Sequence, residues 1–417
     1  MAWTDIFDTE VFSTGLGAQV DLNTEQSSLE WIDCEFAGVT YDAGQTDTKR
    51  SRRSRGAGTQ RLTGKVWPRV SIRFPLHGQI STYAYASNSP AFAGAMRMLN
   101  FLGGSSALAY QAAGITPSDG NTVTTVTSAS KAGCLMAARD TSDGLVRGVG
   151  FFKSAAIGAV DVFDDMAAQP GAGAGRLASV TMYPSSAAPS PLTIRVTGES
   201  AQQDRRYIGC MLSKVSIKPD QDDRLYGVAE FIAYGGENRQ TSGGLQAVTD
   251  YLMLEPMLQR GGARWVLGSN VFTTLADGTV DADGTCDVRD VELTIEIPHY
   301  ISKCPPRGQG VKEVVCRSPI IMASFTLPDI PDFYDGTEQF AEKAWRNLTQ
   351  ASLSCYMGDT PGQIFAWNMP RGIVTQFPDN PTVDGMLHRR VTLEAGNYGG
   401  DAASTDAGNK VFRLGLA

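Results

Sequence analysis

The sequence predicts a mainly β protein with short helices, organised as two similar halves. Several segments alternate apolar and polar residues, which is the pattern of a strand with one buried face. The chain of 417 residues contains 45 glycines and 20 prolines, which favours turns and sheets over long helices. A strand–turn–strand pattern near the middle of the chain recurs close to its end.

The recurring pattern predicts two β hairpins. The first spans 208–235 with an acidic turn at 220–223, and the second spans 363–396 with a proline-bearing turn at 377–381. Each consists of a period-2 strand, a polar turn and a second strand near a glycine. A repeated unit without catalytic residues favours a building block that contacts copies of itself over an enzyme.

Strands and one helix are predicted before each hairpin. In the first half, a strand at 65–76 is followed by a helix at 89–102 that begins at a Ser-Pro cap and ends at paired glycines. In the second half, strands at 290–298 and 313–327 precede a helix capped by Asp335. Glu338 stands at the capping-box spacing. The predicted helix carries an apolar stripe on one face, formed by Phe340, Ala341, Ala344, Trp345 and Leu348.

The length exceeds what one hydrophobic core usually supports, so we expect two domains. The first covers 1–240 and contains an inserted small β module at about 105–206, and the second covers 241–417. The module is expected to have its own short strands, at 121–127, 144–152, 177–183 and 192–196. Between the domains, 237–244 is a polar linker and 245–259 a candidate connecting helix.

The charge balance argues against a general nucleic-acid-binding protein. The formal net charge is −8 and the sequence pI is about 5.1, whereas such proteins gather Lys and Arg to neutralise phosphates. The one concentration of basic residues is at 49–55. Three interpretations of this run stay open: a solvated loop, a loop that docks on an acidic surface of a neighbouring subunit, or a direct contact with DNA.

Seven cysteines, an odd number without Cys-x-x-Cys spacing, predict reduced thiols in a protein made in a cytoplasm. The first residues lack the basic and apolar regions of a signal peptide. The longest apolar run, 320–327, is too short to span a bilayer and suits a buried strand.

Motifs for catalysis and metal binding are incomplete. His77, His299 and His388 are not at metal-ligand spacing from one another or from a cysteine, although Cys304 follows His299 by five residues. The segment 198–202 resembles a nucleophile elbow but lacks its last glycine. We therefore predict no catalytic, cofactor-binding or metal-binding residues, and no enzymatic activity.

Three further motifs have simpler interpretations. The glycine-rich segment 171–175 precedes a predicted strand, whereas a phosphate-binding loop precedes a helix. The acidic segment 281–290 lacks the closing glutamate of a calcium loop. The glycosylation sequon at 347–349 falls inside a predicted helix.

The hairpins at 207–235 and 363–396, with the strand–helix unit before each, resemble bacteriophage tail tube proteins, and the resemblance covers most of 60–417. The stretch 159–184 is similar to a small β module of some tail proteins. The resemblance implies tail-tube-type β-sandwich or barrel domains, each flanked by a helix, that form stacked hexameric rings. In some long-tailed phages two such domains are fused, and three chains make a pseudo-hexameric ring. The long insertion departs from the minimal family pattern, and would decorate the outer surface.

The function that this resemblance implies is that of a structural virion protein. Self-assembled rings would form the hollow tail tube through which DNA is ejected, with the protein assembled in the bacterial host cytoplasm and located in the virion tail. The expected partners are other copies of the chain, the tape measure protein, and the tail terminator and distal tail proteins, with no membrane. DNA would pass through the lumen without specific binding, and an acidic wall would repel it. Loops 37–64 and 300–312 are expected to bridge to the next ring.

Two alternatives stay open. One is another tail structural protein, such as a terminator, distal hub or decoration protein. The other is an enzyme or a carbohydrate-binding β protein, which exposed Trp clusters or paired carboxylates in a cleft would support. The six tryptophans are scattered instead, at Trp3, Trp31, Trp67, Trp265, Trp345 and Trp367. A trimeric ring is favoured over a hexameric one, while the host and the contractile or non-contractile nature of the tail stay open.

Overall fold

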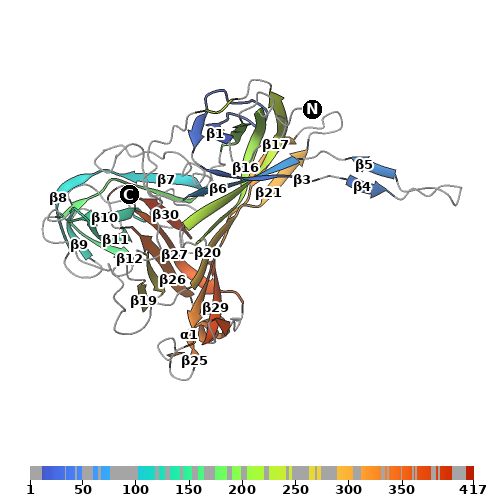
Figure 1. Cartoon of the computed structure of the whole chain (residues 1–417). Helices are drawn as coiled ribbons and strands as arrows, with labels where there is room; N and C mark the ends of the chain where they lie inside the picture. Colours follow the sequence, from blue (N-terminus) through green and yellow to red (C-terminus); the bar gives the residue numbers. More distant parts are fainter. Residues whose placement is uncertain are drawn as a thin grey trace.

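A computed structural model of the chain shows a large antiparallel β structure, which confirms the mainly β prediction (Figure 1). The structure describes residues 12–32, 34–42, 45–48, 60–63, 67–75, 102–117, 122–126, 132–140, 144–152, 158–163, 174–185, 190–198, 204–219, 225–240, 244–246, 263–267, 270–273, 289–303, 311–329, 334–335, 338–348, 350–358, 361, 364–376, 382–383, 386–396 and 410–417. Within these residues there is one α-helix, α1 (Phe340–Asn347).

Seven consecutive antiparallel strands form what we call the main sheet. In sheet order they are β3 (Glu35–Asp42), β6 (Trp67–Pro75), β17 (Leu225–Gln240), β16 (Asp204–Pro219), β20 (Arg289–Glu296), β23 (Ile320–Pro328) and β29 (Met386–Ala395). The predicted strands at 65–76 and 290–298 are β6 and β20. The predicted first hairpin is β16–β17, whose strands pair from Asp204 and Gln240 to Pro219 and Leu225.

A second layer of strands continues from both halves of the main sheet. Next to β16 lie β15 (Leu192–Gly198), β1 (Phe12–Ala18) and β2 (Glu30–Ile32). Next to β29 lies β27 (Phe365–Val374), which pairs with β26 (Gln350–Met357) and β30 (Arg413–Leu416). The layer is completed by β18 (Ala263–Leu267) and β19 (Asn270–Thr273) beside β26, and by β14 (Ser179–Pro184) and β7 (Gly103–Leu108) beside β30.

The core between the main sheet and this second layer draws on both halves of the chain. Phe74 and Phe231 from the first half and Leu293, Phe325 and Trp367 from the second belong to one contiguous cluster of buried side chains. The alternation that the sequence predicts for β6 is confirmed, since its apolar side chains are buried in this cluster. Because the strands of the two halves also pair directly at β16–β20, the predicted domain boundary near residue 240 separates halves that share one core.

The inserted module contains a closed barrel of six short strands, drawn in green and teal in Figure 1. Its strands are β8 (Gln111–Pro117), β9 (Thr122–Val126), β10 (Leu135–Arg139), β11 (Val146–Phe152), β12 (Gly158–Phe163) and β13 (Ala174–Arg176). The module is therefore shorter than the predicted 105–206. The strands at its two ends, including the predicted 177–183 and 192–196, pair in the second layer instead, as β7, β14 and β15.

Three small hairpins and one short strand complete the described elements. The hairpins are β4 (Gln45–Thr48) with β5 (Gln60–Thr63), β21 (His299–Lys303) with β22 (Val311–Cys316), and β24 (Tyr334–Asp335) with β25 (Glu338–Gln339). The short strand β28 (Thr382–Val383) pairs with the start of β29. The hairpin β21–β22 corrects the prediction of one strand at 313–327, because the chain leaves the sheet at Arg317–Pro319 between β22 and β23.

The helix of the second half begins later than predicted and is not buried as predicted. Asp335 and Glu338 do not form a capping box, because they face each other as paired residues of β24 and β25. The stripe is also not a buried face, since Trp345 is 37% and Leu348 is 70% exposed. Arg389 holds α1 to the sheet through an ion pair with Glu342, and Leu348 ends the helix with a positive φ. The predicted helix at 89–102, except for Leu102, and most of the connecting helix at 245–259 lie outside the described residues.

The second predicted hairpin is only partly formed. β27 and β29 pair over three positions, Gly372–Val374 with Leu393–Ala395. Most of β29 pairs instead with β23, and most of β27 with β26. The pattern of alternation located the strands correctly but did not fix their partners.

The main sheet and β27 together contain the same four-strand unit twice. In chain order the first unit is β3, β6, β16 and β17, and the second is β20, β23, β27 and β29. In both units the first strand pairs with the second, the second with the fourth, and the fourth with the third. In both, a hairpin lies between the first and second strands. The third strand of the first unit pairs with the first strand of the second, so the units are joined head to tail.

Candidate functional site

The candidate site is the face of the main sheet that points away from the core, which we call the polar face. Strand alternation places buried residues such as Ile72, Val215 and Leu393 on the core side, and their chain neighbours on the opposite side. The described charged side chains of this face are Arg69, Arg73, Lys214, Lys218, Glu230, Glu292, Glu296, Arg390 and Glu394. The face therefore crosses both four-strand units.

The charges of the polar face nearly cancel. The five basic and four acidic side chains give a formal charge of +1. Lys214 stands directly between Glu230 and Glu296 on the neighbouring strands, and its Nζ lies 3.6 Å from Oε1 of Glu296. These side chains are more than a third exposed, so such pairs contribute little to stability. The net charge of −8 of the whole chain is consequently not concentrated on the described part of this face.

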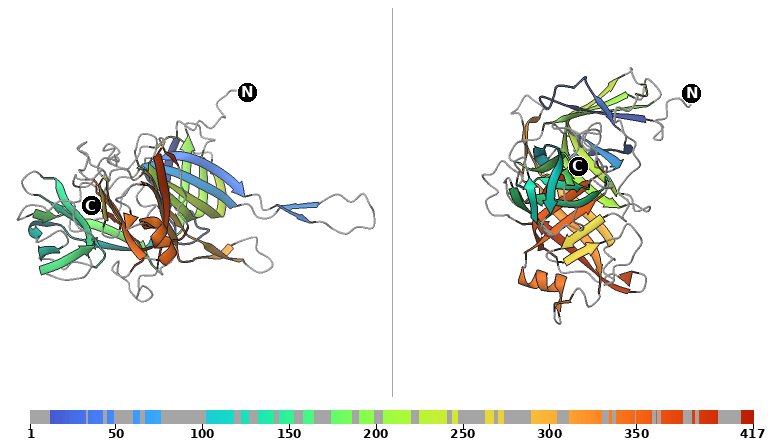
Figure 2. Two further views of the ribbon diagram at one scale, coloured as in Figure 1. Left: turned by 90° about the horizontal axis from the view of Figure 1, so that it is seen from below. Right: turned by 90° about the vertical axis from the view of Figure 1, so that its left-hand side faces the viewer.

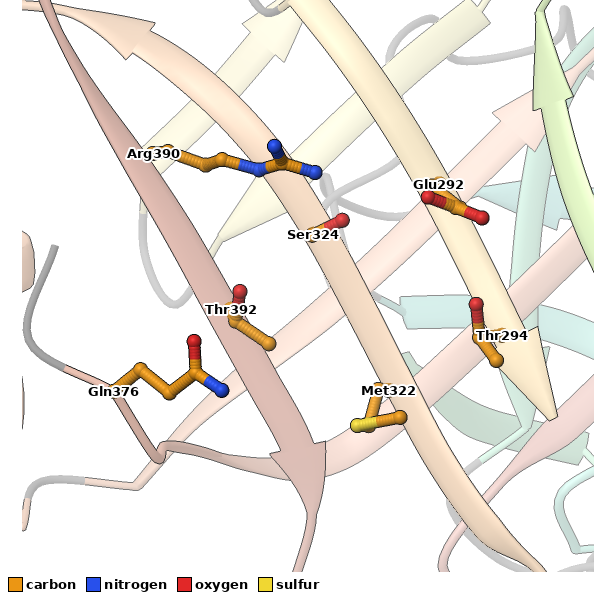
Figure 3. A pocket seen from close by; sticks show the side chains of 7 residues that line it. All are labelled: Glu292, Thr294, Met322, Ser324, Gln376, Arg390 and Thr392. Carbon is orange, nitrogen blue, oxygen red and sulfur yellow. The ribbon is translucent and has the colours of Figure 1, made fainter. Parts of the chain in front are cut away.

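A shallow depression of about 250 Å³ lies on the polar face of the second unit (Figure 3). It forms where the small Ser324 of β23 is flanked by longer side chains. Figure 3 shows Arg390 extending from β29 over β23, with Glu292 on β20 at the other side. The remaining lining residues are Thr294, Met322, Gln376 and Thr392. The depression is thus lined by hydroxyl, amide and thioether groups next to one acidic and one basic side chain. This lining suits weak polar contacts, and it holds no nucleophile hydrogen-bonded to a general base.

At one end of the polar face, the hairpin β21–β22 packs on the first unit. Tyr234 of β17 lies between Trp67 and His299, at ring-centroid distances of 5.4 and 5.7 Å. The His299 ring joins two groups of the first unit, because Nδ1 lies 2.9 Å from the Tyr234 hydroxyl and Nε2 lies 2.8 Å from the Leu212 carbonyl oxygen. Since a carbonyl only accepts, Nε2 donates and Nδ1 accepts from Tyr234.

Burial keeps the ionisable groups of this contact neutral. Desolvation lowers the pKa of His299, an effect that the hydrogen bond to Leu212 partly opposes. Desolvation raises the pKa of Tyr234 to about 12 and also raises the pKa of the Cys316 thiol, the residue opposite His299 in the hairpin. A thiol with a raised pKa is not activated as a nucleophile. The geometry therefore fits a packing contact between the two units.

The other sequence-predicted candidates are not brought together. His388 is fully buried in β29, and Asn347 is the last residue of α1. The described members of the nucleophile-elbow and glycine-rich segments lie in strands, Gly198 at the end of β15 and Ala174 in β13. The following candidates lie outside the described residues: His77, Cys304, 199–202, 171–173, 281–288 and the basic run 49–55.

Further findings concern metal ligands, cysteines and membrane-spanning helices, within the described ranges only. No group of His, Cys, Asp and Glu side chains there has the arrangement of a metal site. Cys34, Cys134, Cys210, Cys316 and Cys355 are not joined in disulfides. α1 is too short and too polar to cross a membrane, and it is the only helix among these residues.

A comparison of the sequence with models of known protein families finds no match, and neither does a comparison with curated protein sequences. The repeated unit, the polar face and the contact between the units are therefore the features that indicate function.

Sequence reasoning missed the hairpins between the first and second strands, although a signal for aligning the units was present. Glu230 and Glu394 are each followed, four residues later, by Tyr-Gly-Gly. Register supports this alignment, because Glu230 pairs with Ser71 of β6 and Glu394 pairs with Met322 of β23. The same alignment superposes Pro68 on Pro319.

Proposed function

We propose that this chain is a self-assembling structural protein of the bacteriophage tail tube type. Copies would form rings that stack into a hollow tube, and the tube would be the conduit for DNA. The observation that carries the proposal is the four-strand unit that occurs twice in one chain and is joined head to tail. A unit that already pairs with a copy of itself inside the chain has the geometry to pair with further copies.

The two ends of the duplicated sheet support head-to-tail assembly. At one end, β3 pairs with β6 and with no other strand of the described chain. At the other end, β26 covers the edge of β27 only as far as Ile373. The edge of β27 that follows Ile373 corresponds to the segment Lys214–Ile217 of β16 in the first unit. In the first unit this segment pairs with β20. An exposed edge promotes aggregation unless it is covered, and pairing β3 with the edge beyond Ile373 of another copy would cover both.

A head-to-tail contact forms a ring if its rotation closes and a helical filament if it does not. With two units per chain, three chains supply the six units of a pseudo-hexameric ring. The second layer lies on the core side of the main sheet, so in a ring it is outside and the polar face lines the bore. A bore whose charges nearly cancel offers no concentrated positive charge to retain phosphates, so DNA passes without being bound.

Negative-stain electron microscopy and native mass spectrometry of the purified chain test this proposal. We expect rings or tubes with an axial bore wide enough for duplex DNA, and a ring mass of three 44.6 kDa chains. Six chains per ring would keep the tube but contradict the role of the duplication. A chain that stays monomeric on prolonged concentration would contradict the proposal.

Abundance in the virion separates a tube subunit from the other tail proteins. A tube subunit is required in many rings, whereas a terminator or distal hub occupies one or two. The expected partners along the tube are the tape measure protein in the bore and the terminator and distal tail proteins at its ends. Quantitative mass spectrometry of purified virions therefore distinguishes these roles.

A further inference from the structure

The two four-strand units carry hairpins at the same place, and the two hairpins have different environments. β4–β5 leaves the first unit between β3 and β6, and β21–β22 leaves the second unit between β20 and β23. In the left view of Figure 2 both hairpins project toward the same side of the molecule. Because the units correspond strand for strand, the surface that one hairpin contacts indicates the kind of surface that the other would contact.

The hairpin of the second unit packs on the unit that precedes it in the chain. Ile301 and Val314 lie in one apolar cluster with Met211, Tyr234 and Trp67 of the first unit. His299 adds its two hydrogen-bond contacts, to Tyr234 and to the Leu212 carbonyl. The opposite face of this hairpin is open, since Tyr300 is 57% and Val315 is 45% exposed. One face of β21–β22 is therefore buried against the preceding unit.

Among the described residues, no four-strand unit precedes the hairpin of the first unit. Among the described strands, β4 and β5 pair only with each other. Figures 1 and 2 show them standing apart from the rest of the described structure. In a head-to-tail assembly, the unit that precedes the first unit is the second unit of another copy.

Charge complementarity supports the second half as the partner surface. Residues 45–63 contain six basic residues and one acidic residue, a formal charge of +5. Residues 241–417 contain 14 basic and 21 acidic residues, a formal charge of −7. Opposite charges of this size accelerate encounter and fix orientation between partners.

The alignment of the units indicates where on the second unit the hairpin docks. Because Pro68 corresponds to Pro319, Arg69 beside the occupied site of the first unit corresponds to Ile320 of the second. Ile320 is 39% exposed at the start of β23, next to Glu296 of β20. The second unit thus presents an exposed apolar side chain beside an acidic one, next to the position equivalent to the occupied site.

We infer that the β4–β5 hairpin of one copy docks on the second unit of another copy, around Ile320 and Glu296, within the same ring. It would occupy there the place that β21–β22 occupies on the first unit of its own chain. The inference rests on the proposed self-assembly, and it places the β4–β5 hairpin in a contact within a ring and not in the bridge between rings.

The first test removes the hairpin without disturbing the sheet. Asp42 and Trp67 are directly paired, so replacing 43–66 by Asn-Gly joins β3 to β6 through a two-residue turn. We expect this variant to keep the unfolding midpoint of the unchanged monomer and to lose the rings. A matched control replaces 304–310 of the other hairpin by Asn-Gly, because Lys303 and Val311 are also paired. The control keeps the buried face of β21–β22 and should keep the rings.

The second test locates the contact. A photo-crosslinking amino acid at Leu62 should capture peptides of the second half of another copy that include Ile320. Ile320→Lys should weaken association about tenfold or more, because it places a like charge opposite a basic hairpin. The control is Val20→Lys, at a side chain that is 95% exposed, and it should not weaken association.

The outcomes separate the inference from the proposed function. Rings formed by the 43–66 replacement variant, or crosslinks from Leu62 only to a copy in the adjacent ring, would overturn the inference and leave the tube intact. If the unchanged chain forms no rings and Leu62 gives no crosslink between copies, both fail. Loss of rings in the replacement variant together with crosslinks around Ile320 supports both.

Discussion

Ile295→Ala tests whether the two halves of the chain behave as one cooperative body. Ile295 lies in β20 of the second half, is 2% exposed, and is paired on one side with Val215 of the first half and on the other with Ile321. It belongs to the cluster that contains core residues of both halves. A perturbation at this position should therefore reach both halves.

The expected magnitude follows from burial. Truncating a fully buried isoleucine to alanine removes apolar contacts and leaves a cavity, which costs about 2–5 kcal/mol of unfolding free energy. The exposed control Val20→Ala should change it by about 0.5 kcal/mol or less. Since Ile295 contacts strands on both sides, we expect Ile295→Ala to lose much more unfolding free energy than Val20→Ala.

Hydrogen exchange measured by mass spectrometry on the monomer is the appropriate assay, because it reports each strand separately. Peptides from β6 and β17 in the first half and from β23 and β29 in the second should lose similar protection in Ile295→Ala. Denaturant unfolding should show one transition with a lower midpoint and an unchanged slope. Full protection of β6 and β17 beside weakened β23 and β29 would refute the shared core and favour two independent domains.

Three other predictions concern single contacts. Burial lowers the pKa of His299 below its ordinary 6.5, so the contacts of the neutral ring stabilise the fold above about pH 6.5 and this stabilisation is lost as pH falls toward the lowered pKa. The unfolding free energies of the wild type and His299→Gln, measured from pH 8 to 5, should therefore converge on acidification. Gly209→Ala should lower the unfolding temperature more than Gly236→Ala, although both glycines have a positive φ. A Cβ at residue 209 would lie 2.3 Å from a backbone oxygen, whereas a Cβ at residue 236 meets nothing within 4 Å. Gly236→Ala should therefore cost only the backbone strain, about 1–2 kcal/mol of unfolding free energy. Arg389→Met should lower the unfolding free energy by about 1–3 kcal/mol and reduce the hydrogen-exchange protection of α1, because the largely buried guanidinium lies 3.1 Å from Glu342. Equal protection of α1 in the wild type and the variant would contradict this role of Arg389.

Strand positions were predictable where one face of a strand is buried. In β6 and β20 the alternation of Val70, Ile72 and Leu293 with polar neighbours identifies both the strand and the face that meets the core. The same logic failed for α1, because an apolar stripe indicates a buried face only if another element covers it. Trp345 and Leu348 are exposed at the end of a helix that Arg389 holds through a charged contact.

Strand partners were not predictable from the same pattern. The alternation in β27 and β29 suits a simple hairpin, yet β29 pairs mostly with β23. Period-2 alternation states which side chains point inward and contains no information on which strand lies alongside. The candidate site depends on this missing information. Lys214 and Glu230 face each other within the predicted hairpin β16–β17, but Glu296 meets Lys214 only because β20, from the other half of the chain, pairs with β16.

By itself, the sequence determined the β class, the repeated hairpin pattern, the positions of the strands with a clear alternation and the lack of a complete catalytic or metal motif. These are local properties, set by periodicity and spacing along the chain. Only the tertiary structure decided that the halves share one core, that the units join head to tail, and that the polar face carries nearly balanced charge. Those properties depend on contacts between residues up to hundreds of positions apart, which are selected by the burial of the whole set of apolar faces together.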